Sequence, residues 1–218
     1  MTVETHCPLC AGNALAPYHQ DRRRPYRQCG TCCLVFVPPG WYLTPEAELA
    51  QYNCHQNDVG DAGYRQFLSR LALPLIARLA PGAQGLDFGC GPGPALAHML
   101  REAGFDVALY DRFFYPDDSV LQARRYAFIS ATEVVEHLHQ PGHELERLWS
   151  LLQPGGWLGI MTKLVSDQTA FANWHYKNDP THVCFFSADT WRWWAREHDA
   201  SLEILGADVI LLRRGEST

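Results

Sequence analysis

The chain has 218 residues, enough for one medium-sized domain and a small addition to it. An apolar content of 47% and a charged content of 19% exclude a disordered chain and indicate a packed core. The net charge of −6 excludes the class of strongly basic proteins that bind nucleic acid through their overall charge.

No targeting or membrane segment stands out in the sequence. Residues 1–10 lack the apolar central region of a signal peptide. Residues 71–80 form the most apolar helical stretch, which is too short to cross a bilayer and contains Pro74 and Arg78. We therefore expect a cytoplasmic protein without a membrane partner, whose eight cysteines stay reduced and serve metal binding or packing.

Four cysteines in two pairs characterise the first 40 residues. Cys7 and Cys10 form one Cys-x2-Cys pair, Cys29 and Cys32 form a second, and 18 residues separate the two pairs. Each pair places two thiolates on one side of a tight turn, so two pairs can complete a tetrahedral Zn²⁺ site. We predict a zinc ribbon over residues 1–40, with a structural metal because four thiolates leave no position open for substrate. The alternative is four unligated thiols.

Three consecutive arginines, Arg22 to Arg24, lie between the two cysteine pairs. They could contact nucleic acid, but three arginines do not make a patch, and a solvated loop is the plainer interpretation. A Pro-Pro-Gly breaker ends the ribbon, and residues 41–62 read as a mixed, polar linker. Apolar residues then recur at helical spacing, which predicts one helix, with a possible kink at Pro74, at the start of a domain over residues 63–218.

A glycine-rich turn between a strand and a helix carries the most information. Residues 84–88 read as a short buried strand, Gly89, Gly91 and Gly93 follow it, and an amphipathic helix then ends at Gly104. Such a unit opens a doubly wound nucleotide-binding sheet, in which glycines let the backbone come close to a ligand. Taken alone, the motif would also suit a dinucleotide-binding fold.

Two acidic residues favour a ligand other than a pyrophosphate. Asp87 precedes the glycine turn by two residues, where its carboxylate would repel a pyrophosphate but suit an ammonium group. Asp111 ends the next apolar strand, where an acid commonly binds ribose hydroxyls; the alternative is an ordinary turn residue. The sequence contains no phosphate-binding loop of the Gly-x4-Gly-Lys-Ser/Thr type, which excludes a nucleoside triphosphatase of that class.

These segments resemble the ordered motifs of class I S-adenosylmethionine-dependent methyltransferases. The resemblance covers residues 84–213 and rests on LDFGCGPG (86–93), the acid in LYDR (109–112), FISATEVVEHL (128–138) and LLQPGGWLGIMT (151–162). The cysteine quartet followed by LVFVPP also resembles the zinc-ribbon heads of some members. The resemblance implies an α/β fold with a doubly wound, mainly parallel sheet, helices on both faces, and an antiparallel edge hairpin near the chain end.

The same resemblance implies S-adenosylmethionine as cofactor and S-adenosylhomocysteine as product. Asp87 and the glycines would border the methionine end, Asp111 would hold the ribose, and residues of the fourth strand would border the site. Cys90 reads as a small packed residue rather than a nucleophile. The implied cofactor-binding residues are Asp87, Gly89, Cys90, Gly91, Gly93, Asp111, Arg112, Thr132 and Glu133.

One region departs from the family pattern. Only residues 112–125 separate the second strand from the fourth strand, which is predicted at 126–130. A full helix and a third strand normally need more chain than that. We expect the third strand to be absent or rudimentary, with Phe113, Phe114 or Tyr115 covering the adenine face or packing in the core.

The substrate side is rich in histidine. Methyl transfer from a sulfonium needs positioning and, for a weak nucleophile, removal of a proton, a task that suits an imidazole. We predict His182 as the leading base and His175 as the second candidate, both in an aromatic loop after the fifth strand; His137, after the fourth strand, could orient substrate or act as a base. The alternatives are a helix-start residue for His137 and a local turn around His182. A metal site of His175 and His182 lacks an evident third ligand.

We therefore expect O-, N- or C-methylation of a small-molecule acceptor. An RNA base methyltransferase that uses the ribbon to bind RNA is an alternative, weakened by the acidic body of the chain. A non-catalytic, methyltransferase-like binding module is another: the short third-strand region favours it, and the intact Asp87, Gly89, Gly91 and Asp111 oppose it. Nucleic acid thus stays the less favoured partner, and the sequence contains no signal for an oligomeric state.

Overall fold

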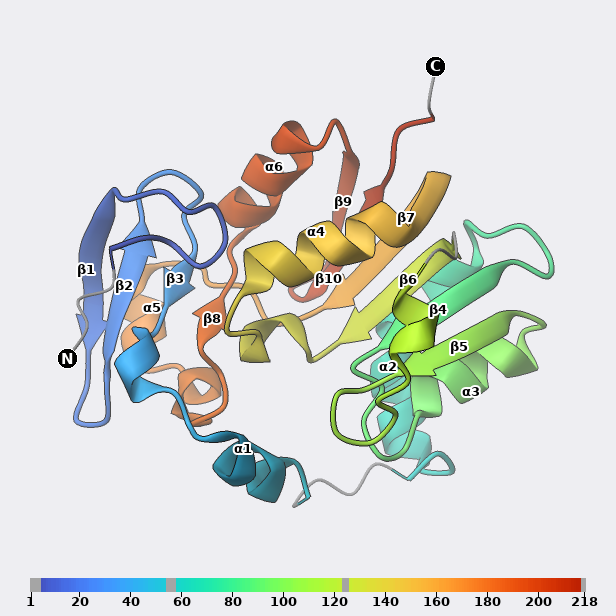
Figure 1. The fold of residues 1–218 in the computed structure, drawn as a ribbon, viewed down its shortest axis with the longest axis horizontal. Coiled ribbons are helices and arrows are strands. Elements are labelled where there is room, and N and C mark those ends of the chain that lie inside the picture. The colour runs from blue at the N-terminus through green and yellow to red at the C-terminus, as the bar shows by residue number, and fades with distance from the viewer. Residues whose placement is uncertain (1–4, 54–57, 123–125, 217–218) are drawn as a thin grey trace.

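Two β-sheets of different size organise the chain (Figure 1). The structure is a computed structural model and describes residues 5–53, 58–122 and 126–216. The larger, six-stranded sheet lies in the centre of Figure 1, and the smaller, four-stranded sheet lies on the blue, N-terminal side. Within the described residues, every helix falls short of the length and apolarity that a membrane crossing needs.

The six-stranded sheet has the doubly wound, mainly parallel arrangement that the sequence predicts. Its strand order is β5-β4-β6-β7-β10-β9, and the pairing is parallel from β5 to β7. β10 runs antiparallel to both β7 and β9, which confirms the predicted edge hairpin. The strands span Gln84–Phe88 (β4), Asp106–Tyr110 (β5), Tyr126–Thr132 (β6), Leu152–Met161 (β7), Ser201–Leu205 (β9) and Val209–Arg213 (β10).

Helices cover both faces of this sheet. α2 and α3 lie behind it in the view of Figure 1, and α4 and α6 lie in front. Leu68, Leu71 and Leu75 of α2 are buried at helical spacing and belong to one apolar cluster with Phe128 of β6. The helices span Ala62–Ile76 (α2), Ala95–Glu102 (α3), Pro141–Leu151 (α4) and Ala188–Glu197 (α6).

Capping side chains fix where two of these helices begin. The Asp61 carboxylate accepts a hydrogen bond from the N–H of Tyr64 at 2.7 Å, at the start of α2. The Ser187 hydroxyl accepts one from the N–H of Thr190 at 3.1 Å, and the reciprocal bond completes a capping box. These two bonds fix the start of α6 at Ser187. α2 is one helix with Pro74 inside it, as its apolar spacing predicts.

The smaller sheet joins the N-terminal segment to the C-terminal half of the chain. Its order is β1-β2-β3-β8, so its last strand comes from the far end of the sequence. Val35 pairs with Phe185 and Phe36 with Cys184, in antiparallel register. The N-terminal ribbon is thus interlocked with the rest of the protein. The strands span Leu15–Gln20 (β1), Pro25–Cys29 (β2), Val35–Phe36 (β3) and Cys184–Phe185 (β8).

The stretch predicted as a polar linker contains regular structure. A 3-10 turn, η1, spans Pro39–Trp41, and a helix, α1, spans Pro45–Tyr52. Thr44 caps α1 with Pro45 at its first turn, a common helix start. Residues 54–57 of the predicted linker lie outside the described residues, and the domain limits themselves stay a prediction. The remaining short elements are α5 (Gln168–Ala172) and the 3-10 turns η2 (Asp118–Leu121), η3 (Val135–His137) and η4 (His175–Asn178).

The region between β5 and β6 contains no third strand among its described residues. An isolated bridge between Asp111 and Tyr115 closes a turn, and η2 follows. Residues 123–125 lie outside the described part of the chain. The expectation of an absent or rudimentary third strand is therefore confirmed for residues 112–122, and β5 forms the edge of the sheet.

Candidate functional site

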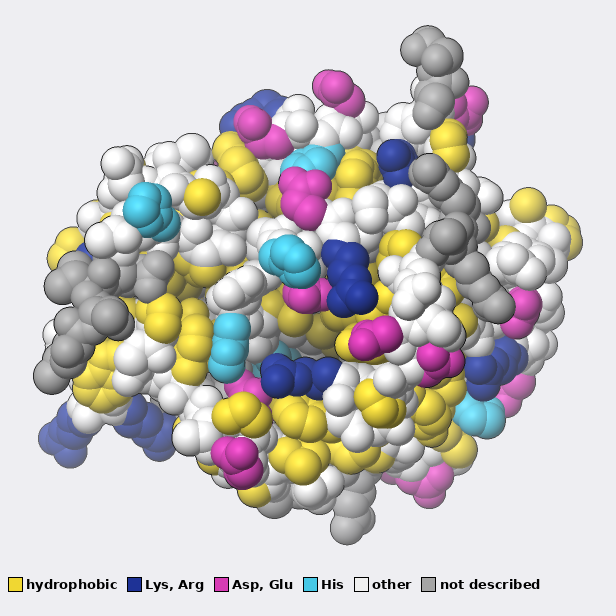
Figure 2. Space-filling view, viewed as in Figure 1, with side chains coloured by type: hydrophobic (Ala, Val, Ile, Leu, Met, Phe, Trp, Pro, Cys, Tyr) yellow, Lys and Arg dark blue, Asp and Glu magenta, His cyan; other side chains and the backbone are white. Residues whose placement is uncertain are grey.

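A cavity of about 650 Å³ opens at the carboxyl ends of β4, β5 and β6. In an open parallel sheet this edge is where ligands bind, because the loops that follow the strands meet there. Figure 2 shows a hollow near the centre of this face, with basic, acidic and histidine side chains around it. The cavity is lined at one end by the glycine turn after β4 and at the other by His137 and His182.

The glycine turn after β4 is shaped for close approach by a ligand. Gly89 has φ +70° and Gly91 has φ +64°, a region that favours glycine. A Cβ atom at Gly89 would lie 2.5 Å from Cγ2 of Val134, which follows β6. Only glycine therefore fits at this position, because any side chain would collide with Val134 and strain the backbone.

Asp87 places a buried carboxyl group beside the turn. Its side chain is 3% exposed and accepts a hydrogen bond from the Ser130 hydroxyl at 2.7 Å. Burial raises the pKa of Asp87 to about 6, because the charged form loses water as a neighbour. An ammonium group that entered the cavity could form an ion pair with this carboxylate, so Asp87 fits the amino-acid end of S-adenosylmethionine.

Asp111 ties two loops together at the end of β5. One carboxylate oxygen accepts a hydrogen bond from the N–H of Gly91 at 3.0 Å. The other accepts bonds from the N–H groups of Phe113 at 2.9 Å and Phe114 at 3.1 Å. The turn role that the sequence left as an alternative is thus present. Each carboxylate oxygen has two lone pairs, so the ribose role stays a prediction beside it.

Most of the other implied cofactor residues also line the cavity. Cys90, Arg112, Thr132 and Glu133 do so, whereas Gly93 lies outside the lining. Phe113 and Phe114 line it as well, whereas Tyr115 does not, and the packing of adenine against these rings stays a prediction.

Sequence reasoning missed the wall that α1 contributes. Tyr52 lines the cavity, and Glu48, one turn earlier, is 2% exposed. The Glu48 carboxylate lies 2.7 Å from Nε2 of His139 and 3.6 Å from the Arg112 guanidinium. The sequence around Glu48 could not predict these contacts, because Arg112 follows β5 and His139 follows β6, both far from α1 in the sequence.

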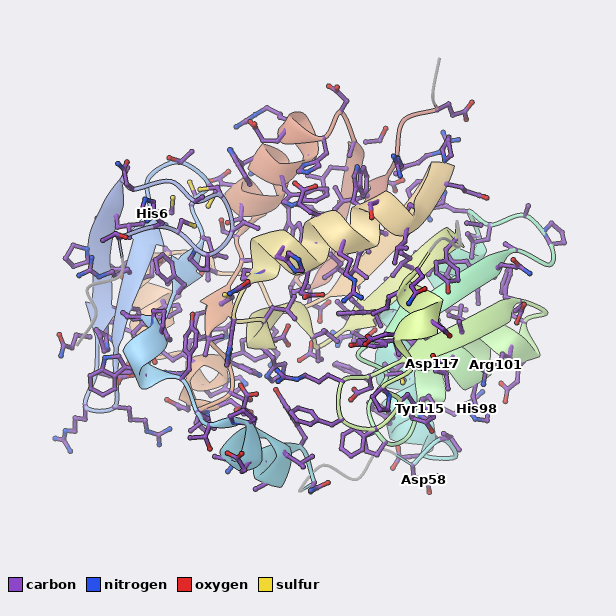
Figure 3. All side chains as sticks on the ribbon, viewed as in Figure 1. His6, Asp58, His98, Arg101, Tyr115 and Asp117 are labelled. Atoms are coloured by element: carbon purple, nitrogen blue, oxygen red, sulfur yellow. The ribbon has the colours of Figure 1, made fainter. Side chains whose placement is uncertain are left out.

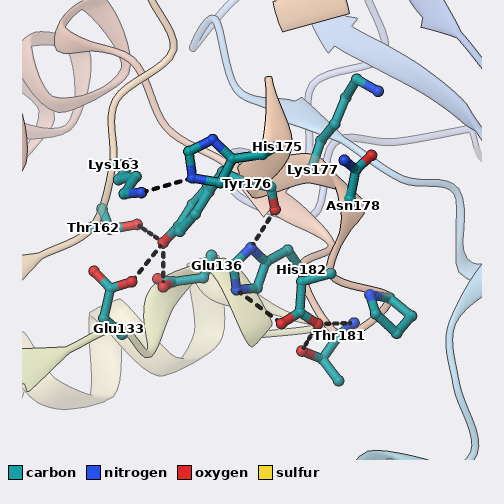
Figure 4. Close-up of polar contacts among 12 residues, drawn as sticks. Glu133, Glu136, Thr162, Lys163, His175, Tyr176, Lys177, Asn178, Thr181 and His182 are labelled. Atoms are coloured by element: carbon teal, nitrogen blue, oxygen red, sulfur yellow. Dashed lines mark hydrogen bonds and ion pairs between the residues drawn. The ribbon is translucent and has the colours of Figure 1, made fainter. Parts of the chain in front are cut away.

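Two acids, the partly buried Glu133 and the buried Glu136, share a hydrogen-bond partner beside the cavity (Figure 4). The Tyr176 hydroxyl hydrogen-bonds to Glu136 and lies 3.3 Å from both Oε2 of Glu133 and Oγ1 of Thr162. Burial, followed by the charge of Glu133, raises the pKa of Glu136 to about 8. Burial likewise raises the pKa of Glu133 to about 7. This corner of the cavity therefore concentrates acidic groups.

The structure brings two of the three histidine candidates together. The rings of His137 and His182 lie 4.6 Å apart between centroids, nearly edge to face, and both line the cavity. Nδ1 of His182 lies 2.8 Å from the Tyr176 carbonyl oxygen, and Nε2 lies 3.8 Å from an Asp179 oxygen. His175 is exposed, lies outside the lining, and contacts Lys163 at 3.2 Å instead. His175 is therefore separated from the candidate site.

The four predicted zinc-ligating cysteines form one cluster. The sulfur atoms of Cys7, Cys10, Cys29 and Cys32 all lie within 4.8 Å of one another, with two pairs at 3.5 Å. The N–H groups of two neighbouring residues point at Cys10 and Cys29 at 3.4 Å, as they do toward thiolates. His6, labelled beside the sulfur atoms in Figure 3, is not in the cluster. The donor set and its spacing fit a Zn²⁺ ion.

Arg24 connects the ribbon to the loop that carries His182. Its guanidinium donates to the carbonyl oxygens of Lys177 at 2.9 Å, Asp179 at 2.8 Å and Pro180 at 3.0 Å. Arg24 is 6% exposed, whereas Arg22 and Arg23 are exposed. The interpretation of the arginine run as a solvated loop is therefore wrong for Arg24, because the carbonyl groups of η4 and the following turn surround its side chain.

Comparison with known proteins agrees with this arrangement. A family model described as "Methyltransferase domain" matches residues 61–203. Two solved methyltransferase structures are similar in fold. No curated protein matches the sequence.

The first is the 1,6-didemethyltoxoflavin N1-methyltransferase of Burkholderia thailandensis, solved with S-adenosylhomocysteine. It is 17% identical with a TM-score of 0.50, and the match covers 92% of this chain and 99% of that one. The second is the magnesium protoporphyrin IX methyltransferase of Synechocystis PCC 6803, also solved with S-adenosylhomocysteine. It is 13% identical with a TM-score of 0.51, covering 81% and 97%. At such low identities these likenesses show a shared fold.

Proposed function

Because the chain belongs to the methyltransferase-domain family, we propose that it is an S-adenosylmethionine-dependent methyltransferase acting on a small-molecule acceptor. The observation that carries this proposal is one continuous cavity with two different ends. A buried carboxylate and a glycine turn form one end, and a pair of imidazoles forms the other. A donor and an acceptor can thus lie in a single continuous cavity.

At the cofactor end, each group has a defined task. Asp87 binds the ammonium group, and the open backbone at Gly89 and Gly91 lets the amino-acid portion lie against the turn. Asp111 holds the ribose hydroxyls while it keeps the loop after β5 in place. S-Adenosylmethionine supplies an already activated methyl group, so the chain has to position it rather than activate it.

At the acceptor end, the chain excludes water and prepares the acceptor for transfer. Tyr52 of α1 contributes to the cavity wall from the linker side. An acceptor hydroxyl or amine loses a proton during methylation, and His137 and His182 are the imidazoles beside which that happens. His175 takes no part in this proposal because it lies outside the cavity.

A small molecule suits this cavity better than an RNA base. The cavity volume of about 650 Å³ lies in the range of small-molecule sites. Arg24, which would have contributed to an RNA contact, is buried against protein carbonyl groups. In the two proteins of similar fold, the named acceptors are a didemethyltoxoflavin and a magnesium porphyrin, both of them small molecules.

We also propose that the cysteine cluster binds a structural Zn²⁺ ion. The supporting observation is the convergence of four thiols in a segment whose own sheet contains only short strands. Such small units usually need a metal to stay folded. The ribbon would then hold β3 against β8 and, through Arg24, fix the loop that leads to His182.

Isothermal titration calorimetry of S-adenosylmethionine and S-adenosylhomocysteine into the zinc-loaded protein tests the proposal. We expect dissociation constants of about 1–100 μM, the range in which enzymes commonly bind substrates. Asp87→Asn should weaken S-adenosylmethionine binding at least about tenfold, since an amide cannot neutralise the ammonium group. Asp106→Asn, on the exposed start of β5, is the matched control and should bind as the wild type does. A folded wild type that binds neither ligand would contradict the proposal and favour a non-catalytic module.

A further inference from the structure

Three side chains at the acceptor end converge as metal ligands do. The ligand atoms of Glu136, His137 and His182 all lie within 4.8 Å of one another. Glu136 and His137 belong to η3, and His182 precedes β8, so the fold rather than a local motif brings them together. His137 and His182 also line the cavity, which places the cluster beside the bound acceptor.

The surroundings of Oε2 of Glu136 favour a positively charged partner. Its side chain is fully buried, and Oε2 has no hydrogen-bond partner among the described residues. Oε1 of neighbouring Glu133 is in the same condition, and neither acid forms an ion pair with a described lysine or arginine. Burying an unsatisfied carboxylate oxygen costs free energy, and a second acid nearby increases that cost. A cation bound by Oε2 of Glu136 would satisfy that oxygen and reduce the repulsion between the two acids.

The surrounding hydrogen bonds orient the ligand atoms. The Tyr176 carbonyl oxygen can only accept, so Nδ1 of His182 carries the proton in their 2.8 Å hydrogen bond. In the neutral ring this leaves the lone pair on Nε2. The Tyr176 hydroxyl holds Oε1 of Glu136, which leaves Oε2 for a further partner. Backbone carbonyls and hydroxyls that fix the non-ligating atoms in this way are typical around metal-binding imidazoles and carboxylates.

We propose that Glu136, His137 and His182 bind a divalent first-row transition-metal ion whose open coordination positions face the acceptor. One carboxylate and two imidazoles are a donor set that such ions prefer, whereas the four thiolates of the ribbon select zinc. The site is therefore chemically distinct from the ribbon cluster. This inference rests on the proposed methyl transfer, and it makes the two imidazoles ligands of the ion rather than direct bases.

The ion would favour a hydroxyl-bearing acceptor. A hydroxyl placed on a divalent cation loses its proton more readily than in water, as metal-bound water does. The proton passes to a water molecule, the acceptor oxygen forms the new bond to the methyl carbon, and the sulfur–carbon bond breaks with its electron pair remaining on sulfur. The sulfonium thereby becomes a neutral thioether, and no oxidant or reductant is needed.

Mn²⁺ titration of the full chain loaded with one equivalent of zinc, enough for the four cysteines alone, tests the site without any acceptor. We expect one Mn²⁺ per chain, observed as loss of the free-ion signal in electron paramagnetic resonance. The dissociation constant should rise at least about tenfold in Glu136→Gln and in His137→Ala. His98→Ala is the matched control, since His98 is exposed on α3 (Figure 3), and it should bind Mn²⁺ like the wild type.

Thermal unfolding keeps the test decisive where a variant is unstable. Mn²⁺ should raise the melting temperature of the wild type and of His98→Ala, but not of the partly buried His137→Ala, because only intact sites bind the ion in the folded state. Millimolar Mn²⁺ that neither binds nor stabilises the folded wild type would overturn the metal site. S-Adenosylmethionine titrated into the same sample separates the two proposals. If the protein binds S-adenosylmethionine but not Mn²⁺, only the proposed metal site is contradicted. If it binds Mn²⁺ but not S-adenosylmethionine, only the proposed methyltransferase function is contradicted.

Discussion

The two ends of the cavity are built in different ways. The cofactor end comes from β4, the turn behind it and the end of β5, which follow one another closely along the chain. The acceptor end joins η3 to the loop before β8, and Arg24 links that loop to the ribbon. A local sequence motif thus predicts the cofactor end, whereas the acceptor end forms only when segments that are distant in the sequence pack together.

This difference has a consequence for how each end responds to damage. The cofactor end depends on hydrogen bonds such as that from Gly91 to Asp111, within one strand–helix–strand unit. The acceptor end depends on β3–β8 pairing and on the buried guanidinium of Arg24. A change in the ribbon should therefore loosen the acceptor end and leave the cofactor end largely intact.

Loss of the ribbon metal should have the largest effect. In Cys29→Ser we expect zinc to be lost and β1–β3 to unfold, since structural zinc contributes apparent binding free energies of about 10–16 kcal/mol. Amides of residues 177–185 should then exchange at least about 100-fold faster, as local opening becomes easy. Hydrogen-exchange mass spectrometry measures this. Cys33→Ser, next to the cluster but outside it, is the control. Equal loss of protection at residues 85–97 would contradict the separation of the two ends.

Truncating Arg24 should come next. Arg24→Ala removes the guanidinium donor from three carbonyl oxygens that are buried or partly buried, and hydrogen bonds to charged groups contribute about 1.5–3 kcal/mol each. Because their contributions are not additive, we expect the free energy of unfolding to fall by about 3 kcal/mol in urea titrations. Arg22→Ala removes an exposed arginine two residues away and should change it by less than about 0.5 kcal/mol. Similar losses in both variants would mean that the guanidinium does not hold the loop.

A methyl group in the glycine turn probes the cofactor end alone. In Gly89→Ala the Cβ meets Val134 and the backbone at φ +70° is strained, so the dissociation constant for S-adenosylmethionine should rise at least about tenfold. Gly82→Ala is a matched control, with φ +72° and no atom within 4 Å of the added Cβ. It carries the strain without the contact and should bind the cofactor normally. Calorimetry distinguishes the two, and weak binding in both would assign the effect to global strain.

The pH dependence of cofactor binding should be the mildest effect. With the pKa of Asp87 raised to about 6 by burial, its carboxylate is mostly ionised at pH 7 and mostly protonated at pH 5. Affinity for the ammonium group should therefore fall about tenfold between these pH values. Asp87→Asn should flatten the profile. Ser130→Ala, which removes a hydrogen bond that lowers this pKa, should move the loss of affinity to higher pH.

The sequence predicted the secondary structure around the cofactor end well because its signals are local. The strand, turn and helix around Gly89 and the short third-strand region all follow from residues within a few positions. Hydrophobic periodicity could not predict β8, because that strand has only two residues. It also could not predict the burial of Glu48 in α1, because the partners of Glu48 lie elsewhere in the chain.

The acceptor end shows the same limit at the level of single side chains. His175 and His182 are close in sequence, yet the structure turns one outward and pairs the other with His137. Arg24 lies in a run of three arginines, but only tertiary contacts separate it from its exposed neighbours. Composition and spacing cannot distinguish such residues, because the burial of each side chain depends on which carbonyl group or ring from a distant segment packs against it.

The pairing of β3 with β8 also sets an order of events during synthesis. Phe36 leaves the ribosome long before Cys184 is added, and at typical elongation rates the interval is roughly 7–30 s. During that time the smaller sheet has three of its four strands, with the edge of β3 unpaired. The edge is covered only when the C-terminal half arrives with β8. A nascent chain that stops before residue 184 therefore presents an open strand edge, a feature by which quality-control factors can distinguish it from a finished protein.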